Sequence, residues 1–142
     1  MPGSEALTVD LANYPDLVVI YLGMRVKAFP GTKKLLGLGP QIDKAGAERP
    51  DGLLFYENNI IFKLFPLHIG MRWYWRDFES MERWTRSEPH RKWWRDYVHD
   101  TGGTGFWHEV YAMLGGMEGI YTDIPGVGFE GFAPTQTAKG SL

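Results

Sequence analysis

Two histidines lie in sequence contexts where imidazole could carry out acid–base chemistry. His108 sits within a strand-like run, between Trp107 and Glu109, and His90 opens a helical segment rich in tryptophan. Because imidazole titrates near neutral pH, either histidine could act as a general base on an activated C–H or O–H group. The alternative for each is a structural histidine satisfied by a local hydrogen bond. Neighbouring side chains of a strand point to opposite faces, so His108 and Glu109 are poorly placed to form one acid–base pair, and one of them should face a pocket.

Tryptophan is concentrated near these histidines. All six tryptophans fall between positions 73 and 107. Each could line an apolar ligand site at a low cost in conformational entropy, or could fill the core or a dimer interface. We predict substrate contacts from the aromatic and acidic side chains of this region, namely Trp84, Trp94, Trp107, Tyr74 and Glu109.

A candidate anion-binding group lies on a predicted strand in the same region. Arg72 and Arg76 share a strand face with Tyr74, which places a cation beside a phenol. A buried cation would stabilise an enolate or peroxide intermediate, so Arg72 is a candidate catalytic residue. The alternative is that these arginines are exposed at a sheet edge or pair with Asp77 and Glu79.

Composition and motifs exclude several other kinds of chemistry. The chain has no cysteine, which rules out disulfides, thiolate catalysis and cysteine-based metal sites. It also has no P-loop, no GxSxG sequence and no His-x-x-x-His or glutamate-rich metal run, so we predict no metal ligand set from motifs. A GxGxxG match at residues 126–131 has too little chain after it to form a dinucleotide-binding unit.

The charge balance argues against polyanionic partners. Fifteen basic and 17 acidic residues give a formal net charge of −2, which offers no attraction for nucleic acid or anionic membranes. The first ten residues do not resemble a secretory leader, and no apolar run approaches the ~20 residues that span a bilayer. We expect no nucleic-acid or membrane partner and a cytoplasmic location, which the lack of cysteine also favours.

Hydrophobic periodicity predicts the strands that position these side chains. The segment from Asp16 to Val26 is apolar on both alternating faces, as in a strand covered on both sides. Two turns are predicted, at Asn58-Asn59 and at Gly115-Gly116. The expected strands lie at residues 16–26, 52–57, 71–76, 105–114 and 119–124.

Helical spacing and capping residues predict the helices. A broken helix is expected over residues 33–45, because glycines and Pro40 interrupt its leucines. A second helix should begin after Asp77, an N-cap residue, since apolar residues then recur at intervals of three and four. A third should begin at Ser87-Glu88-Pro89, with the serine as cap acceptor. One side of this third helix should carry four aromatic residues: His90, Trp93, Trp94 and Tyr97.

The length and order of these elements define the expected fold. With 142 residues the chain should form one domain, with a core at about residues 16–125 and a loop-like tail over 126–142. The order strand, helix, strand, strand, helix, strand is the split βαβ pattern of ferredoxin-like α+β folds, in which helices cover one face of an antiparallel sheet. The other sheet face is still apolar, so we predict a homodimer that packs sheet to sheet.

The stretches from Tyr74 to Trp94 and from Gly105 to Pro125 carry a family resemblance. They resemble the antibiotic-biosynthesis-monooxygenase-like superfamily of dimeric α/β barrels, and within it the branch that includes the fumagillin-pathway monooxygenase. The resemblance implies a homodimer with a pocket between each sheet and its own helices. It also implies oxygenation of polyketide or aromatic metabolites, in some members without a cofactor, whereas relatives bind and degrade haem. In this respect His90 resembles the helix histidine that ligates iron in some haem-binding members.

Three functional hypotheses follow. The first is a cofactor-independent monooxygenase of a hydrophobic or aromatic secondary metabolite, in which His108 or His90 deprotonates the substrate and the carbanion reduces dioxygen. The second is a haem-binding enzyme with His90 as axial ligand. The third is a non-oxygenase ligand-binding protein, isomerase or cyclase on the same fold, because one fold hosts many activities.

Overall fold

The computed structural model describes residues 5–114 and 119–138, and the chain divides into two units. The central unit comprises residues 17–112, and the terminal unit combines residues 1–16 with 113–142. Each unit contains its own antiparallel sheet. All of the candidate catalytic and substrate-binding residues belong to the central unit.

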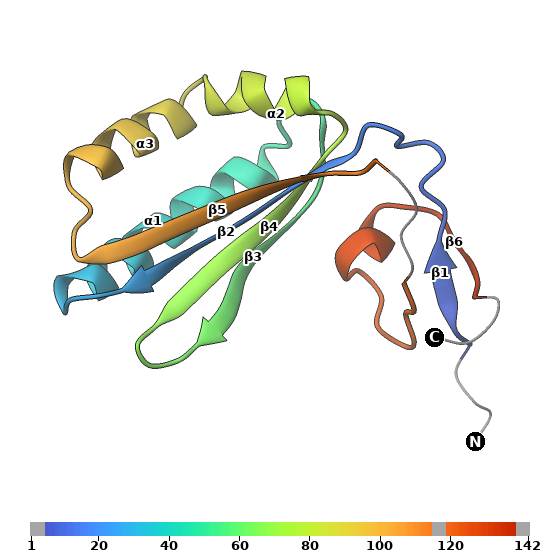
Figure 1. Ribbon diagram of the computed structural model, residues 1–142, viewed down its shortest axis with the longest axis horizontal. Helices are drawn as coiled ribbons and strands as arrows, with labels where there is room; N and C mark the ends of the chain where they lie inside the picture. The colour runs from blue at the N-terminus through green and yellow to red at the C-terminus, as the bar shows by residue number, and fades with distance from the viewer. Residues whose placement is uncertain (1–4, 115–118, 139–142) are drawn as a thin grey trace. The chain divides into compact units, whose positions relative to one another are not determined.

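Four antiparallel strands form the sheet of the central unit (Figure 1). Their spatial order is β3-β4-β2-β5. The first of these strands in the sequence therefore lies inside the sheet, between the third and the fourth, as the split βαβ pattern requires. The strands are β2 (Val18–Val26), β3 (Leu53–Lys63), β4 (His68–Trp75) and β5 (Thr104–Ala112).

Three helices within residues 17–112 lie on one face of this sheet (Figure 1). They are α1 (Pro30–Ala47), α2 (Phe78–Thr85) and α3 (His90–His99). This arrangement confirms the predicted ferredoxin-like α+β fold. We call the sheet face beneath the helices the covered face, which carries Leu22 and Phe106. The other is the open face, which carries Tyr21, Arg72 and Trp107.

Helix α1 differs from its prediction. The sequence predicts a broken helix over residues 33–45, but the structure has one continuous helix that includes Pro40. A proline removes one backbone hydrogen bond from a helix, and tertiary packing can outweigh that loss. Here Leu35 and Ala45 are buried, and Gly46 lies against the Tyr56 ring so closely that an added methyl group would collide with it.

The predicted turn at Asn58 and Asn59 is wrong, because β3 continues through both residues. The pairing of β3 with β4 shifts register between Glu57 and Ile60, and Asn59 adopts a positive φ of 60°. Asparagine tolerates this left-handed conformation, so the pair forms an irregularity within the strand instead of ending it. The side chain of Asn58 accepts a hydrogen bond from Trp73 Nε1 at 2.7 Å, which ties the irregularity to the core.

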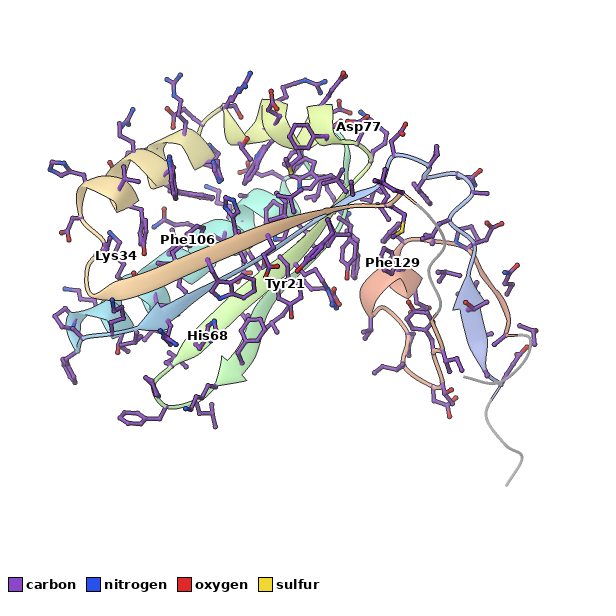
Figure 2. The ribbon with its side chains drawn as sticks, in the orientation of Figure 1. Tyr21, Lys34, His68, Asp77, Phe106 and Phe129 are labelled. Carbon is purple, nitrogen blue, oxygen red and sulfur yellow. The ribbon has the colours of Figure 1, made fainter. Side chains whose placement is uncertain are left out.

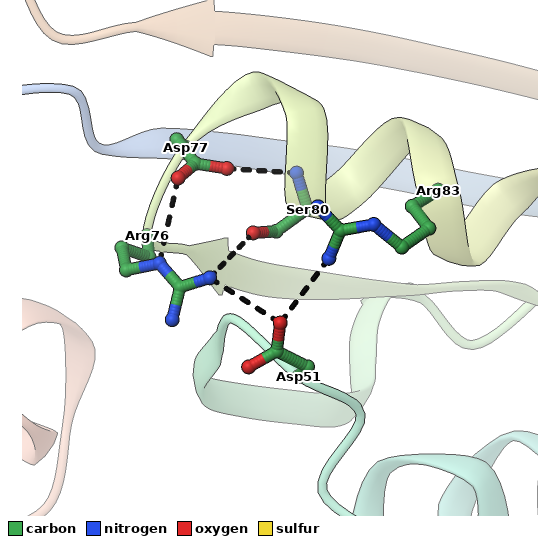
Figure 3. Close-up of polar contacts among 5 residues, drawn as sticks. All are labelled: Asp51, Arg76, Asp77, Ser80 and Arg83. Carbon is green, nitrogen blue, oxygen red and sulfur yellow. Dashed lines mark hydrogen bonds and ion pairs between the residues drawn. The ribbon is translucent and has the colours of Figure 1, made fainter.

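The N-cap predicted at Asp77 is confirmed. Its carboxylate accepts a hydrogen bond from the Ser80 backbone amide at 2.7 Å (Figure 3). Arg76 donates to Ser80 Oγ at 3.0 Å and pairs with Asp77, while Asp51 bridges Arg76 and Arg83. The cap and these ion pairs hold the start of α2 against the end of β4.

The cap predicted at Ser87 is wrong. The Ser87 hydroxyl donates to the carbonyl of Trp84, in the preceding helix, at 2.7 Å. The Glu88 carboxylate instead accepts from the Lys92 backbone amide at 3.1 Å. A carboxylate near a helix N-terminus satisfies a free amide as a serine would, so the sequence indicated the correct helix with the wrong cap.

Tryptophans dominate the core beneath the helices. Trp73 and Trp75 of β4 are 1% and 0% exposed. Their ring centroids lie 5.1 Å and 5.7 Å from that of Trp84 in α2. Val18 and Met81 pack into the same buried cluster. Large rings bury much apolar area per residue, which lets a short helix such as α2 hold its position on the sheet.

The terminal unit has more regular structure than its composition indicates. Strand β1 (Leu7–Val9) pairs with β6 (Thr135–Thr137), and a 3₁₀ turn, η1, spans Gly128–Gly131. Of these elements, η1 and β6 lie where a loop-like tail is predicted. The strand predicted over residues 119–124 is reduced to one bridge between Tyr121 and Leu7. The Gly115-Gly116 turn lies outside the described residues. Pairing between the two ends of a chain leaves no local sequence signal.

Candidate functional site

A cavity of about 90 Å³ lies between the covered face and its helices. Sheet residues such as Leu22 and Phe106 form its floor, and α2 and α3 contribute its roof. Three of the predicted site residues line it, and each comes from a helix: Trp84, His90 and Trp94. The prediction that His90, Trp93, Trp94 and Tyr97 share one side of a helix is confirmed, since all four line this cavity.

Contacts at both ring edges fix the orientation of His90. Its Nδ1 lies 3.0 Å from the carbonyl oxygen of Thr85. Since a carbonyl only accepts hydrogen bonds, Nδ1 carries the proton and Nε2 is the acceptor nitrogen of the neutral ring. The ring is packed 5.1 Å from Trp84 and 6.4 Å from Trp93, measured between centroids. His90 therefore presents a basic nitrogen from an aromatic wall.

The surroundings of His90 keep it neutral at physiological pH. Burial is the largest effect and lowers its pKa below the ordinary value of 6.5. The hydrogen bond to Thr85 raises this pKa, and the charge of nearby His108 lowers it further. A neutral imidazole is the form that can accept a proton, so the site favours base chemistry.

His108 lies on the same sheet face as the cavity. It pairs with Leu22 in the β2–β5 register, and its ring is 5.8 Å from that of Phe106. The side chain is exposed, and among the described residues His90 is the histidine that lines the cavity. The structure therefore brings the two predicted histidines to one face, with His90 at the cavity and His108 beside it.

The remaining predicted site residues lie on the open face. Arg72 pairs with Glu57 at 3.1 Å, and the Tyr74 hydroxyl donates to the same carboxylate at 2.7 Å. Trp107 and Glu109 alternate with His108 along β5 and so point away from the cavity. The structure thus does not bring Arg72, Tyr74, Trp107 and Glu109 together with His90. The prediction that Arg76 shares the face of Arg72 is also wrong, because Arg76 follows the end of β4 and pairs with Asp51 and Asp77.

The open face carries an aromatic cluster that sequence reasoning missed. Trp107 Nε1 donates to His68 Nε2 at 2.8 Å, and Tyr21 stacks on Trp107 at 5.5 Å. Phe62 contacts both His68 and Trp107. Figure 2 shows Tyr21 and His68 on the side of the sheet away from the helices. Burial is the main cause, and Arg25 the second, of a lowered pKa at His68.

Other cavity residues were missed for different reasons. The alternation of β2 places Leu22 and Met24 on one face, which the sequence could have indicated. The role of Thr85 depends on a backbone carbonyl five residues before His90, and no side-chain pattern reports it. Phe106 lines the cavity and lies on the same face of β5 as His108, as strand alternation requires.

Two features are absent from residues 5–114 and 119–138, the part of the chain that the structure describes. No group of three or more histidine, aspartate or glutamate side chains is arranged to hold a metal ion. Within these residues, no helix is long and apolar enough to cross a membrane.

The four-stranded antiparallel sheet with its three helices defines the central unit as a ferredoxin-like α+β fold. The family model for "Monooxygenase af470-like" matches residues 17–129, which is most of the chain. The chain belongs to this monooxygenase-like family. The match covers the whole sheet and all three helices that enclose the cavity.

Similar proteins of two kinds are known. Aliphatic aldoxime dehydratases of Rhodococcus globerulus and Rhodococcus erythropolis are 37% identical over 59 residues, or 39% of this chain and 17% of theirs. The crystal structure of an aldoxime dehydratase with butyraldoxime superposes with a TM-score of 0.59 at 24% identity, over 79% of this chain and 32% of that one. The chain thus spans less than a third of the length of these relatives.

A second structure matches over nearly its full length. It is a protein of Deinococcus radiodurans described as an antibiotic biosynthesis monooxygenase, with a TM-score of 0.55 and 18% identity. The match covers 72% of this chain and 96% of that one. At these identities the solved structures support the fold, and the family match supports the general kind of function.

Proposed function

We propose that the protein is a cofactor-independent monooxygenase of a hydrophobic or aromatic secondary metabolite, with His90 as the base. The observation that carries the proposal is the His90 ring at the wall of an apolar cavity, its Nδ1 bonded to Thr85 and its pKa lowered by burial. Family membership supports an oxygenase, and the resemblance to the fumagillin-pathway branch supports a metabolite substrate.

The proposed reaction needs no external reductant. His90 Nε2 removes a proton from an activated methylene of the substrate, and the carbanion transfers electrons to dioxygen to form a carbon-bound hydroperoxide. Loss of water then leaves a carbonyl group. The methylene loses both hydrogens, one oxygen atom becomes the carbonyl oxygen and the other leaves as water, so atoms and electrons balance. The apolar walls exclude water, which keeps the carbanion from being reprotonated before it meets oxygen.

His108 has a supporting role in this proposal. It is exposed and lies on the same face, and its charge lowers the pKa of His90. Arg72 takes no part in our proposal, because its guanidinium lies on the open face and pairs with Glu57.

Oxygen uptake tests the proposal directly. We expect consumption of dioxygen without added reductant when the protein is mixed with anthrones or phenols that carry an activated methylene. The variant His90→Ala should lose about 10²–10⁴-fold of the rate, the usual contribution of a positioned base. His99→Ala is the matched control, since His99 is exposed at the last turn of the same helix. Uptake that depends on neither substrate nor His90 would contradict the proposal.

Haem binding through His90 is the alternative, and the structure fits it only in part. Nε2 of His90 has the right chemistry for an axial ligand. The rings of Trp84 and Trp93 pack against His90, at 5.1 Å and 6.4 Å between centroids, and occupy space that a macrocycle bound at Nε2 would need. An absorption spectrum recorded after haem addition distinguishes the cofactor-independent enzyme from the haem enzyme. We expect no stoichiometric Soret band, and a band that His90→Ala abolishes would favour the haem enzyme instead.

Dimerisation through the open face is the remaining part of the proposal. This face exposes apolar rings, including Tyr111 at 51% and Phe62 at 39% exposure. A second copy packed on the same face would bury them in a two-fold interface. Light scattering on the eluted protein should report a dimer, and Phe62→Glu should shift it to the monomer mass. Phe29→Glu is the control, because Phe29 is 93% exposed at the start of α1. A monomeric wild-type protein would overturn this assignment.

A further inference from the structure

A second cavity, of about 280 Å³, adjoins the one at His90. It lies between α1 and strands β2 to β4, and it shares Leu22, Leu38 and Met71 with the first cavity. The two cavities share walls from both the sheet and α1, so they adjoin in the space beneath that helix. We call this the α1 cleft. His90 marks one end of it, and the irregular part of β3 marks the other.

The far end of the α1 cleft is polar, unlike its walls. Asp43, Asn58 and Asn59 line it there. Asn58 is fixed at both ends of its amide, since Nδ2 donates to Asp43 Oδ1 at 2.7 Å and Oδ1 accepts from Trp73 Nε1 at 2.7 Å. Trp73 is 1% exposed, so the core holds Asn58 and Asn58 in turn positions the Asp43 carboxylate. Asp43 is exposed and lines the cavity at this polar end.

We infer that the α1 cleft binds one elongated apolar molecule whose far end carries a hydrogen-bond donor, a hydroxyl or an ammonium group, held by Asp43. A carboxylate can only accept hydrogen bonds, so it selects donors and repels anions. The reactive carbon of the same molecule would lie at His90; this placement rests on the proposed function, whereas the binding of the molecule does not.

Two glycines of α1 supply a matched pair of variants. Gly39 lines the cleft, and a methyl group added there would lie 3.8 Å from Asn59 Oδ1, an ordinary contact. A methyl group on Gly37 would meet nothing within 4 Å. Both residues are inside the same helix, so a larger residue gains similar helix propensity at either one. Gly39→Leu should fill the cleft, and Gly37→Leu should leave it open.

The test is calorimetric titration of the full chain with octan-1-ol, octylamine and octanoate. We expect the alcohol and the amine to bind, and octanoate to bind at least about tenfold more weakly because of repulsion by Asp43. Hexan-1-ol should bind about tenfold or more weakly than octan-1-ol, at roughly fourfold per methylene. Gly39→Leu should weaken binding of the alcohol at least about tenfold, with Gly37→Leu within about twofold of the wild type.

A charge variant tests the polar end independently of any effect on packing. Asp43 is exposed at the surface of α1, and Asp43→Asn keeps the shape of the side chain while removing its charge. The difference in affinity between octylamine and octanoate should shrink at least about fivefold in this variant. Equal binding of the two probes to the wild type would overturn recognition by Asp43, and unchanged binding in Gly39→Leu would overturn the α1 cleft as the site.

These outcomes separate the cleft from the oxygenase proposal. The alkyl probes have no activated methylene, so their binding reports the cleft alone. Binding with the predicted selectivity, together with flat oxygen uptake, would retain the cleft and reject the oxygenase. Oxygen uptake that depends on His90 but is unaffected by Gly39→Leu would retain the oxygenase and reject the cleft as its substrate site.

Discussion

The two faces of the central sheet carry the same kinds of residue, but these residues have different roles on each face. On the covered face, Trp73 and Trp75 are buried, and His90 is held over a cavity with one ring nitrogen free to accept a proton. On the open face, His68 accepts from Trp107, and Glu57 accepts from Arg72 and Tyr74. A histidine becomes a candidate base where its acceptor nitrogen is left for a ligand. It becomes structural where a neighbouring side chain already occupies that nitrogen.

The difference also shows why residue type alone is a weak guide to a site. Arg72, Tyr74 and Trp107 on the open face look equipped for chemistry in the sequence. In the structure, however, Arg72 and Tyr74 bond to Glu57, and Trp107 bonds to His68. On the covered face, aromatic and aliphatic side chains line the site together, and a backbone carbonyl orients His90. Chemistry depends on which polar atoms remain unsatisfied near a cavity, and that is a property of packing.

The largest expected effect comes from removing a tryptophan on the covered face. Trp73→Ala should lower the free energy of unfolding by about 3–5 kcal/mol, because it leaves a cavity and breaks the bond to Asn58. Trp107→Ala, on the open face, should cost less than half as much, since that ring is only partly buried. Urea unfolding of both variants measures this. Equal losses of unfolding free energy would show that side chains on the open face contribute as much to stability as those on the covered face.

The helix cap at Asp77 should have an intermediate effect. Asp77→Ala removes the acceptor of the Ser80 amide and should lower the free energy of unfolding by about 1 kcal/mol. Asp77→Asn retains an acceptor and should cost less. Thermal unfolding compares the two. If both variants lose the same stability, the ion pair with Arg76 matters more than the cap, and the covered face is held by charge instead of by backbone hydrogen bonding.

The ion pair on the open face should contribute less again. A double-mutant cycle with Arg72→Met and Glu57→Gln should give a coupling energy of no more than about 1 kcal/mol, as is usual for pairs that solvent reaches. Raising the salt concentration should reduce it. A coupling energy several times larger would mean that the pair is desolvated, which is the expected consequence of a second copy covering the open face.

The most gradual effect should be the dependence of stability on pH. Both His68 and His90 have pKa values below the ordinary 6.5, mainly because of burial. As pH falls through about 6.5, the unfolded chain therefore binds more protons than the folded chain does. The free energy of unfolding decreases as pH falls through this range and increases as pH rises through it. Urea midpoints at pH 7.5 and 5.5 measure the loss. His90→Gln should flatten the dependence more than His68→Gln, because His90 is more deeply buried; the opposite order would contradict this comparison of the two faces.

Several parts of the fold were predictable because their signals are local. Alternation in β5 assigned His108 and Glu109 to opposite faces, and Asp77 was recognisable as a cap. Spacings of three and four likewise predicted a helix with four aromatic residues on one side, namely His90, Trp93, Trp94 and Tyr97. Each of these depends on residues within about one turn or one strand of each other.

What the sequence could not determine depends on contacts between distant segments. It could not show that α1 continues through Pro40, because packing of Leu35 and Ala45 on the sheet compensates for the lost hydrogen bond. It could not pair β1 with β6, whose partners lie more than 120 residues apart. Nor could it show that Trp84 and Trp107 lie on opposite faces of one sheet.

The sequence by itself determined the ferredoxin-like order of elements, the two faces of each strand and the small set of residues able to move a proton. Only the tertiary structure decided which face the helices cover, and therefore that His90 lines the cavity while Arg72 and Trp107 are satisfied elsewhere. The physical reason is that strand alternation divides side chains into two sets, each of which here contains tryptophan and histidine. Which set is enclosed depends on how the helices pack across the sheet, and no local pattern in the chain specifies that.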